Sequence, residues 1–216
     1  MSYESVLQEV ARCGIVPVIA IDSVDAALPL ADALLDGGLP LVEITFRTAA
    51  AAAVIETIRK KRPEMLVGAG TVVTPENLAA AQRCGAQFGV APGFNPRTVE
   101  SAGQAGLPFV PGVCTPSEIE QALALDCTVL KFFPAEASGG VEMLKAFAAP
   151  YNHLGVRFVP TGGVSMANLE TYLAVKTVAA VGGTWIAKNE DIAGGKWAEI
   201  RDRCKKAVDL VAKVRG

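Results

Sequence analysis

One apolar run indicates the fold of this chain first, Thr128-Val129-Leu130-Lys131-Phe132-Phe133. Side chains alternate between the two faces of a strand, so an extended segment here would carry apolar side chains on both faces. That pattern is typical of strands in a parallel sheet covered by helices, rather than of strands with one face in water. Only Lys131 breaks the apolar pattern of the run.

Similar runs recur at a fairly even interval along the chain, and Ala-rich segments with helical spacing lie between them. With the first run they are Val16–Ile21, Leu41–Phe46, Leu66–Thr71, Gln87–Pro92, Pro108–Val113, Thr128–Phe133, Arg157–Thr161 and Thr177–Gly182. Eight strand–helix units joined by right-handed crossovers predict an α/β fold, a (β/α)8 TIM barrel formed as a single domain over residues 1–216. A doubly wound sheet, which usually has fewer strands, is the second choice.

The ends of the chain add helices to this scheme. Met1–Cys13 fits no strand, and Val6, Leu7 and Val10 predict an extra N-terminal helix that closes the bottom of the barrel. A last helix is predicted from about Trp197 to Val214. Its basic side chains are expected on a solvated face, and they are Arg201, Arg203, Lys205, Lys206 and Lys213.

Helix-start signals stand at three joints between the predicted strands and helices. Thr74-Pro75 and Asn95-Pro96 each place a capping side chain before a proline at the first helical position. Thr115-Pro116-Ser117-Glu118 has the Thr-x-x-Glu spacing of a capping box. These three sites predict where helices begin.

The composition excludes several classes of protein. The 216 residues are 51% hydrophobic and 19% charged, which is enough apolar material for one large core and excludes a disordered chain. The net charge of −2 shows no basic excess, so no nucleic-acid partner is expected. The apolar runs are too short to span a membrane, and Met1–Glu4 lacks the basic start of a signal peptide. A cytoplasmic protein without a membrane partner is expected.

Cysteine and histidine usage argues against metal chemistry. The five cysteines, at positions 13, 84, 114, 127 and 204, form no CxxC pair and are expected to be buried or half-buried thiols of a reducing cytoplasm. His153, the only histidine, is expected at the surface. We therefore expect no metal and no cofactor, and no catalytic triad built on histidine.

Lys131 is the most informative residue of the chain. If it faces the barrel interior, its charged form is costly to bury, and apolar surroundings favour the neutral amine. A neutral amine can attack a ketone and form a Schiff base. The alternative is a lysine that extends from the strand end into water, or one that only balances a buried carboxylate.

A second run, Leu41–Arg47, supports the catalytic interpretation. Glu43, Thr45 and Arg47 alternate on one face of this strand. A carboxylate inside a barrel needs a partner, and Lys131 is the candidate. Arg47 offers a planar guanidinium suited to a substrate carboxylate. Ion pairs of Glu43 with Lys131 or Arg47 that have no chemical role are the alternative.

Barrel enzymes carry their chemistry at the carboxyl ends of the strands. Here the third run ends in Gly68-Ala69-Gly70-Thr71, where small residues let a ligand approach and Thr71 adds a hydroxyl. The fourth ends in Ala91-Pro92-Gly93, which is expected to shape the wall. The seventh and eighth end in Thr161-Gly162-Gly163 and Gly182-Gly183-Thr184, a pattern that favours phosphate binding by backbone N–H groups. Tight turns that merely need glycine are the alternative.

Together these motifs resemble one family. It is that of 2-keto-3-deoxy-6-phosphogluconate (KDPG) and 4-hydroxy-2-oxoglutarate aldolases. The resemblance extends from about Ile15 to the last predicted helix, and it is carried by Val42-Glu43-Ile44-Thr45-Phe46-Arg47-Thr48, Val67-Gly68-Ala69-Gly70-Thr71-Val72, Pro92-Gly93, Lys131-Phe132-Phe133-Pro134-Ala135-Glu136 and Pro160-Thr161-Gly162-Gly163. It implies a homotrimeric, metal-free class I aldolase of the Entner–Doudoroff pathway. Such an enzyme splits the phosphorylated keto acid into pyruvate and glyceraldehyde 3-phosphate, and many members also split 4-hydroxy-2-oxoglutarate into pyruvate and glyoxylate.

The resemblance also implies a role for each candidate residue. Lys131 would form the Schiff base and Glu43 would be the general acid and base. Arg47 and Thr71 would hold the pyruvyl carboxylate, with Pro92 and Phe133 packed around it. The phosphate would be bound at the two glycine turns, by Thr161, Gly162, Gly163, Gly183 and Thr184. Thr184 stands where many members have serine, which keeps the hydroxyl and adds a methyl group.

Three alternatives stay open at this point. The substrate of an aldolase could be the 6-phosphogalactonate epimer, or chiefly 4-hydroxy-2-oxoglutarate. A metal-free phosphosugar isomerase would use Glu43 as a base with no covalent step. A phosphosugar-binding barrel would keep the glycine pairs and use Lys131 only for its charge. Trapping of an imine separates the aldolases from the other two classes.

Overall fold

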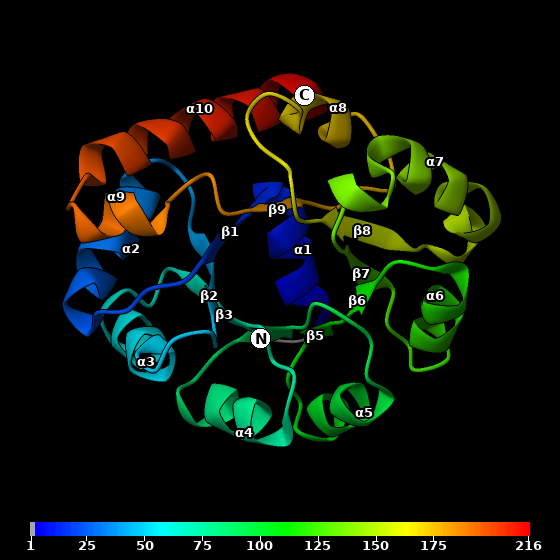
Figure 1. Cartoon of the computed structure of the whole chain (residues 1–216), viewed down its shortest axis with the longest axis horizontal. Helices are drawn as coiled ribbons and strands as arrows, with labels where there is room; N and C mark the ends of the chain where they lie inside the picture. The colour runs from blue at the N-terminus through cyan, green and yellow to red at the C-terminus, as the bar shows by residue number, and fades with distance from the viewer. Residues whose placement is uncertain (1–2) are drawn as a thin grey trace.

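Parallel strands lie inside a ring of helices in the computed structural model, which describes residues 3–216 (Figure 1). The strands are β1 Ile15–Ile19, β2 Leu41–Thr45, β3 Leu66–Gly70, β4 Phe88–Val90, β5 Phe109–Val110, β6 Gly112–Val113, β7 Val129–Phe132, β8 Arg157–Pro160 and β9 Val181–Gly183. The α-helices are α1 Tyr3–Cys13, α2 Ala27–Asp36, α3 Ala51–Lys61, α4 Pro75–Arg83, α5 Pro96–Gln104, α6 Pro116–Leu123, α7 Gly140–Tyr151, α8 Leu169–Leu173, α9 Asn189–Ala193 and α10 Trp197–Arg215. Short 3-10 helices are η1 Val24–Ala26, η2 Glu136–Ser138 and η3 Asn152–Leu154.

The strands of the described residues pair in parallel and form a curled sheet in two parts. One part has six strands in the order β5-β4-β3-β2-β1-β9, and the other has three in the order β6-β7-β8. Isolated bridges, Phe158 with Val178 and Thr161 with Gly182, connect β8 with the segment that contains β9. The predicted α/β fold with a parallel sheet is therefore confirmed. A continuous barrel of eight strands is not what the structure shows.

Two of the predicted strands differ from the observed ones. The run Pro108–Val113 is divided into β5 and β6 at Pro111, since proline has no N–H to donate to a ladder. The run Thr177–Gly182 was wrong in its bounds, because β9 covers only Val181–Gly183. Its first residues still belong to the turn after α8, where the Val178 N–H donates to the Val175 carbonyl at 2.9 Å.

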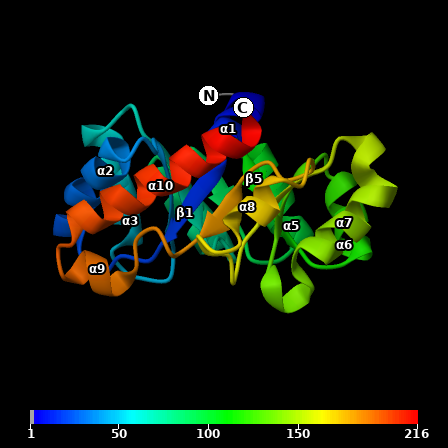
Figure 2. The same ribbon diagram turned by 90° about the horizontal axis from the view of Figure 1, so that it is seen from above.

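The opening segment forms a helix, as predicted, over Tyr3–Cys13, and Met1 and Ser2 lie outside the described residues. Val6 and Val10 are fully buried, whereas Leu7 is only partly buried. Figure 2 shows α1 beside the C-terminal end of α10, at one edge of the molecule. There the Arg215 guanidinium donates to the Ala11 carbonyl at 2.8 Å and to the Ala179 carbonyl at 2.9 Å. α1 thus packs across one end of the strands.

The thiols and the histidine lie where the sequence predicts. Four of the cysteines are buried, Cys114 is half-buried, and all five are free. Burial raises the pKa of Cys127 to about 11 and that of Cys204 to about 12, so both stay protonated at neutral pH. His153 is exposed in η3. Within residues 3–216, no helix has the length and apolar character needed to cross a membrane.

The predicted helix starts are all present. Thr74 Oγ1 accepts from the Asn77 N–H at 3.2 Å, and Asn95 Oδ1 accepts from the Arg97 N–H at 3.1 Å. Thr115 Oγ1 accepts from the Glu118 N–H at 3.3 Å. The capping box differs in one bond, since the Glu118 carboxylate accepts from the N–H of Cys114, one residue earlier than the motif requires, at 2.8 Å. The Thr115 cap and the Glu118 contact fix the loop that leaves β6.

We expect Thr115→Ala to lower the free energy of unfolding by about 0.5–2 kcal/mol, because it removes the cap of α6. Thr57→Ala is the matched control. The Thr57 hydroxyl donates to the Ala53 carbonyl within helix α3, in an exposed bond that contributes little to helix stability. Urea denaturation of the two variants measures the difference, and equal stability of both would contradict a capping role for Thr115.

Candidate active site

Glu43 and Lys131 meet in the interior of the curled sheet. Glu43 lies on β2 and Lys131 on β7, and these residues are only 2% and 5% exposed. Lys131 Nζ is 3.5 Å from Glu43 Oε1. The pairing predicted from strand alternation is therefore present. In the described residues Glu43 forms its ion pair with Lys131, and not with Arg47.

Glycine at position 70 makes room for the Glu43 side chain. Gly70 ends β3 and pairs with Thr45 of β2. A Cβ atom at Gly70 would overlap Glu43 Oε1 and lie 2.7 Å from Glu43 Cγ. A larger residue at this position would push the carboxylate from its place beside Lys131. The Gly68–Thr71 stretch thus serves the buried pair as well as the approach of a ligand.

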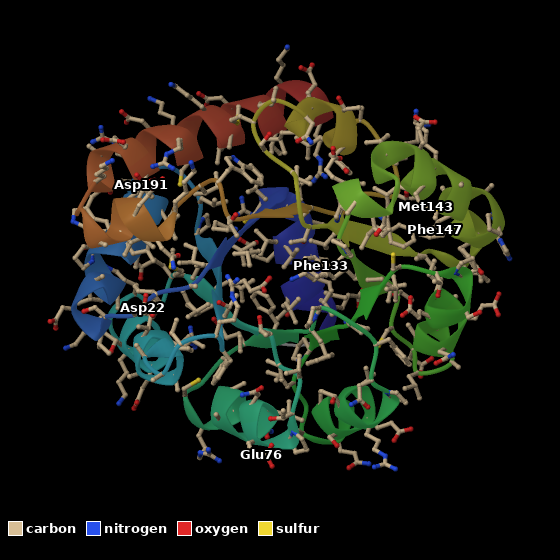
Figure 3. The ribbon with its side chains drawn as sticks, viewed as in Figure 1. Asp22, Glu76, Phe133, Met143, Phe147 and Asp191 are labelled. Carbon is tan, nitrogen blue, oxygen red and sulfur yellow. The ribbon has the colours of Figure 1, made fainter. Side chains whose placement is uncertain are left out.

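Aromatic and hydroxyl groups surround the pair. Lys131 Nζ lies 5.6 Å from the centroid of the Phe133 ring. Figure 3 shows Phe133 toward the centre of the ring of strands, whereas Glu76 lies at its rim. The Thr45 hydroxyl donates to the Ile19 carbonyl at 3.1 Å and accepts from Arg47 Nε at 3.1 Å. This bond orients an otherwise exposed guanidinium at the mouth of the cavity.

All the residues predicted from the sequence line one cavity of about 250 Å³. They are Glu43, Arg47, Thr71, Pro92, Lys131, Phe133, Thr161, Gly162, Gly163, Gly183 and Thr184. Sequence reasoning did not include Val18, Thr45 and Val164 in the site, although they also line this cavity. Thr45 gave a signal, because it shares the inward face of its strand with Glu43. Val18 and Val164 gave none, since an apolar side chain looks the same in a core and in a cavity wall.

A larger cavity of about 360 Å³ lies between η1 and α9. The polar residues that line it are Asp22, Ser23, Asp25 and Asn189. It holds neither a lysine nor a buried ion pair. We therefore place the chemistry in the smaller cavity, on the basis of its side chains rather than its volume.

The backbone of Thr71 is unusual. Its φ is 58°, in the left-handed region that β-branched residues rarely adopt. Backbone strain of this kind is concentrated at functional sites, where the surrounding structure maintains it. Thr71 follows β3 directly and lines the cavity. The conformation, which the sequence alone did not reveal, supports a binding role for this residue.

The other end of the cavity consists of two glycine turns. Gly162 and Gly163 have φ values of +98° and +80°, which glycine adopts without penalty. The first turn is joined to the second by the bridge between Thr161 and Gly182. Residues 161–175 contain no lysine or arginine. The turn residues that line the cavity therefore offer backbone and hydroxyl groups to a ligand.

Arg203 was wrongly predicted on the solvated face of the last helix. Its side chain is half-buried, and it donates to the Trp185 carbonyl at 3.0 Å and to Asp191 Oδ2 at 2.6 Å. The Arg203 guanidinium holds the pKa of the buried Asp191 carboxyl below its usual range. Trp185 follows Thr184 directly, so Arg203 supports the second glycine turn (Asp191 is labelled in Figure 3). Helical periodicity alone gave no signal for this contact.

Residues 6–203 match the model of the family described as KDPG and KHG aldolase. The chain belongs to this family. Among its relatives, the 2-dehydro-3-deoxy-phosphogluconate aldolase of Haemophilus influenzae is 43% identical over 98% of this chain and 100% of its own length. The KHG/KDPG aldolase of Escherichia coli K12 is 40% identical over 90% of this chain and 91% of its own length.

A solved structure of the same family is also similar. It is the KDPG aldolase of Legionella pneumophila with pyruvate captured at low pH as a covalent carbinolamine intermediate. It superposes with a TM-score of 0.90 at 37% identity, covering 96% of this chain and 98% of the other. The family predicted from the sequence motifs is confirmed.

We expect Gly70→Ala to displace the Glu43 carboxylate from Lys131 and to lower the free energy of unfolding by about 1–3 kcal/mol, because the added methyl group overfills the interior. Gly93→Ala is the matched control, since no atom lies within 4 Å of a Cβ placed there. Thermal melts and a crystal structure of each variant provide the measurements. An unmoved carboxylate in a Gly70→Ala variant of unchanged stability would refute this account of the packing.

Proposed function

We propose that this chain is a class I aldolase, a lyase that cleaves 2-keto-3-deoxy-6-phosphogluconate into pyruvate and glyceraldehyde 3-phosphate. One observation carries the proposal, the buried Lys131 with its amine 3.5 Å from the Glu43 carboxylate. Membership of the KDPG and KHG aldolase family supports it. The covalent carbinolamine described for the Legionella structure supports a mechanism in which an amine attacks a ketone.

A second substrate is 4-hydroxy-2-oxoglutarate, which would be cleaved to pyruvate and glyoxylate. The name of the Escherichia coli relative, KHG/KDPG aldolase, favours this reaction. Both substrates carry a 2-keto acid at one end, so the same lysine and the same carboxylate-binding group serve both. They differ at the other end, where only the larger substrate has a phosphate.

The cavity residues divide the substrate between them in this proposal. Arg47 and Thr71 bind the carboxylate, and Pro92 and Phe133 pack around the three carbons next to it. Binding of the carboxylate places the C2 ketone against the Lys131 amine, which lowers the entropic barrier to attack.

The phosphate of the larger substrate lies at the two glycine turns in this proposal. Gly162, Gly163 and Gly183 offer backbone N–H groups, and Thr161 and Thr184 add hydroxyl groups. A neutral site of this kind is favoured by the lack of lysine and arginine in residues 161–175. 4-Hydroxy-2-oxoglutarate carries no phosphate for these turns to bind.

The reaction begins with attack of the neutral Lys131 amine on C2. Loss of water from the carbinolamine gives a protonated imine, which can accept an electron pair. Glu43, through a water molecule, takes the proton of the C4 hydroxyl as the C3–C4 bond breaks. The electrons of that bond form an enamine, and the aldehyde leaves. Glu43 returns a proton to C3, and one water hydrolyses the imine to release pyruvate and the free amine.

We also propose that the 216 residues form one (β/α)8 domain that assembles as a homotrimer in the cytoplasm and needs no metal or cofactor. The bridge between Thr161 and Gly182 supports closure of the two sheets into a barrel. The free, buried thiols favour a reducing compartment. The trimer rests on the family resemblance.

Pyruvate with borohydride should inactivate the protein and add one reduced pyruvyl group at Lys131, because reduction makes the imine permanent. Peptide mass spectrometry identifies the modified residue. Lys145→Met is the matched control, because Lys145 forms an exposed ion pair with Glu142 at 2.8 Å and should leave the adduct unchanged. The absence of any adduct would exclude the Schiff-base mechanism and would favour the isomerase or the binding protein over the aldolase. An adduct at another lysine would exclude Lys131 as the nucleophile.

Glu43→Gln should separate imine formation from carbon–carbon cleavage. Glutamine keeps the volume but takes up no proton near neutral pH, so cleavage and hydrogen exchange at the pyruvate methyl should fall by about 10²–10⁴. Borohydride should still trap Lys131, since its amine, the nucleophile, is still present in this variant. The exposed Glu142→Gln is the control. Methyl exchange near the wild-type rate in a folded Glu43→Gln protein would remove Glu43 from the mechanism.

A further inference from the structure

Glu136 ends the Lys131–Glu136 motif, yet its carboxylate is not among the groups that line the cavity. It belongs to η2 and accepts a hydrogen bond at Oε1 from the Tyr172 hydroxyl of α8. Gly140, at the start of α7, leaves room for this contact, since a Cβ there would lie 3.2 Å from Glu136 Oε1 and 3.4 Å from the Tyr172 hydroxyl. A carboxylate so placed does not reach the reacting carbons.

The same residue is in contact with the first glycine turn. The Glu136 N–H donates to the Gly162 carbonyl at 3.0 Å, and the Ala135 N–H donates to the Thr161 carbonyl at 2.8 Å. Gly163 packs on the side chain, because a Cβ at Gly163 would lie 2.6 Å from both Cβ and Cγ of Glu136. Glu136 thus contacts both glycines of the turn, one through its backbone and one through its side chain.

Tyr172 anchors this contact from the opposite side. The residue is fully buried, and α8 follows the first glycine turn in sequence. Burial and the neighbouring Glu136 carboxylate raise the pKa of Tyr172, so its hydroxyl remains a proton donor throughout the neutral range. The hydrogen bond therefore ties the segment after β7, the turn after β8 and the helix after that turn into one unit.

We propose that Glu136 and Tyr172 are positioning residues for the phosphate end of the substrate. Their hydrogen bond holds the backbone of Gly162 and Gly163 in the conformation that presents N–H groups to a phosphate. The pair acts through the turn and touches no reacting atom. The inference rests on the proposed aldolase function and adds a determinant of its substrate preference.

Tyr172→Phe tests this directly, because it removes the hydroxyl and keeps the buried ring. We expect KM for 2-keto-3-deoxy-6-phosphogluconate to rise roughly tenfold, with kcat within about twofold of wild type, as for loss of one hydrogen bond to a charged group. For 4-hydroxy-2-oxoglutarate, which has no phosphate, kcat/KM should stay within about twofold. A general loss of folding would lower the activity toward both substrates together and would not change the ratio of their kcat/KM values.

Variants of the partner residue sharpen the test. Glu136→Ala should reproduce the tenfold rise in KM, whereas Glu136→Gln, whose amide oxygen still accepts from Tyr172, should restore a KM near wild type. Tyr151→Phe is the matched control. Tyr151 donates to the Glu120 carboxylate at 2.9 Å between α7 and α6, so it provides a second bond from a buried tyrosine to an exposed glutamate, away from the glycine turns. Its loss should leave the ratio of the two substrates unchanged.

The inference is overturned if Tyr172→Phe and Glu136→Ala keep the wild-type ratio of kcat/KM for the two substrates, or lose both activities equally. A wild-type protein with no preference for the phosphorylated substrate overturns it as well. If Tyr172→Phe does not fold, the Glu136→Ala and Glu136→Gln pair decides alone. Failure of the proposed function has a different signature, which is the absence of a pyruvate–borohydride adduct at Lys131 in the wild-type protein.

Discussion

The structure depends on one constraint, the burial of an amine and a carboxylate side by side inside an apolar sheet. Removing two charged groups from water is costly, and only close pairing or neutralisation offsets the cost. The neighbouring strands are adapted to the pair. Glycine at position 70 leaves space for Glu43, and Phe133 covers Lys131. The strands thereby hold the amine and the carboxylate 3.5 Å apart, at the point where the proposed chemistry takes place.

The rest of the cavity is positioned by contacts that lie outside it. The turn at Gly162 is held by Glu136 and Tyr172, and the turn at Gly183 lies beside Trp185, whose carbonyl accepts from Arg203. Both supports use a charged side chain from a later or neighbouring helix, and neither places that charge in the cavity. Backbone turns rich in glycine have many accessible conformations. Rigid contacts behind such turns hold them in one conformation, which is what allows them to select one ligand.

The sequence predicted the cavity better than the fold around it. Period-two alternation put Glu43 and Lys131 on one face of their strands but left open a lysine that extends into water, an alternative that the 5% exposure of Lys131 now excludes. The division at Pro111 was missed although proline lacks the N–H that a strand ladder uses, and the late start of β9 was missed because the turn after α8 extends to Val178. The inward contact of Arg203 was missed because it depends on Trp185 and Asp191, which periodicity within one helix does not show. Val18 and Val164 escaped notice because a cavity wall and a core use the same residue types. The left-handed backbone of Thr71 leaves no trace in composition.

The distribution of charge in the cavity also sets the direction in which a substrate with two anionic ends can bind. The cationic side chains that line it are Lys131, within β7, and Arg47, just after β2, and the glycine turns present only neutral groups. A lysine or arginine in the turns would attract the substrate carboxylate as well as the phosphate and would permit the reverse orientation, with C2 far from the amine. In the proposed function the Arg47 guanidinium would bind the carboxylate, whereas backbone N–H groups suit the oxygens of a phosphate. Under the proposed function, the one guanidinium that lines the cavity therefore favours the orientation that brings the 2-keto carboxylate, and with it C2, next to Lys131.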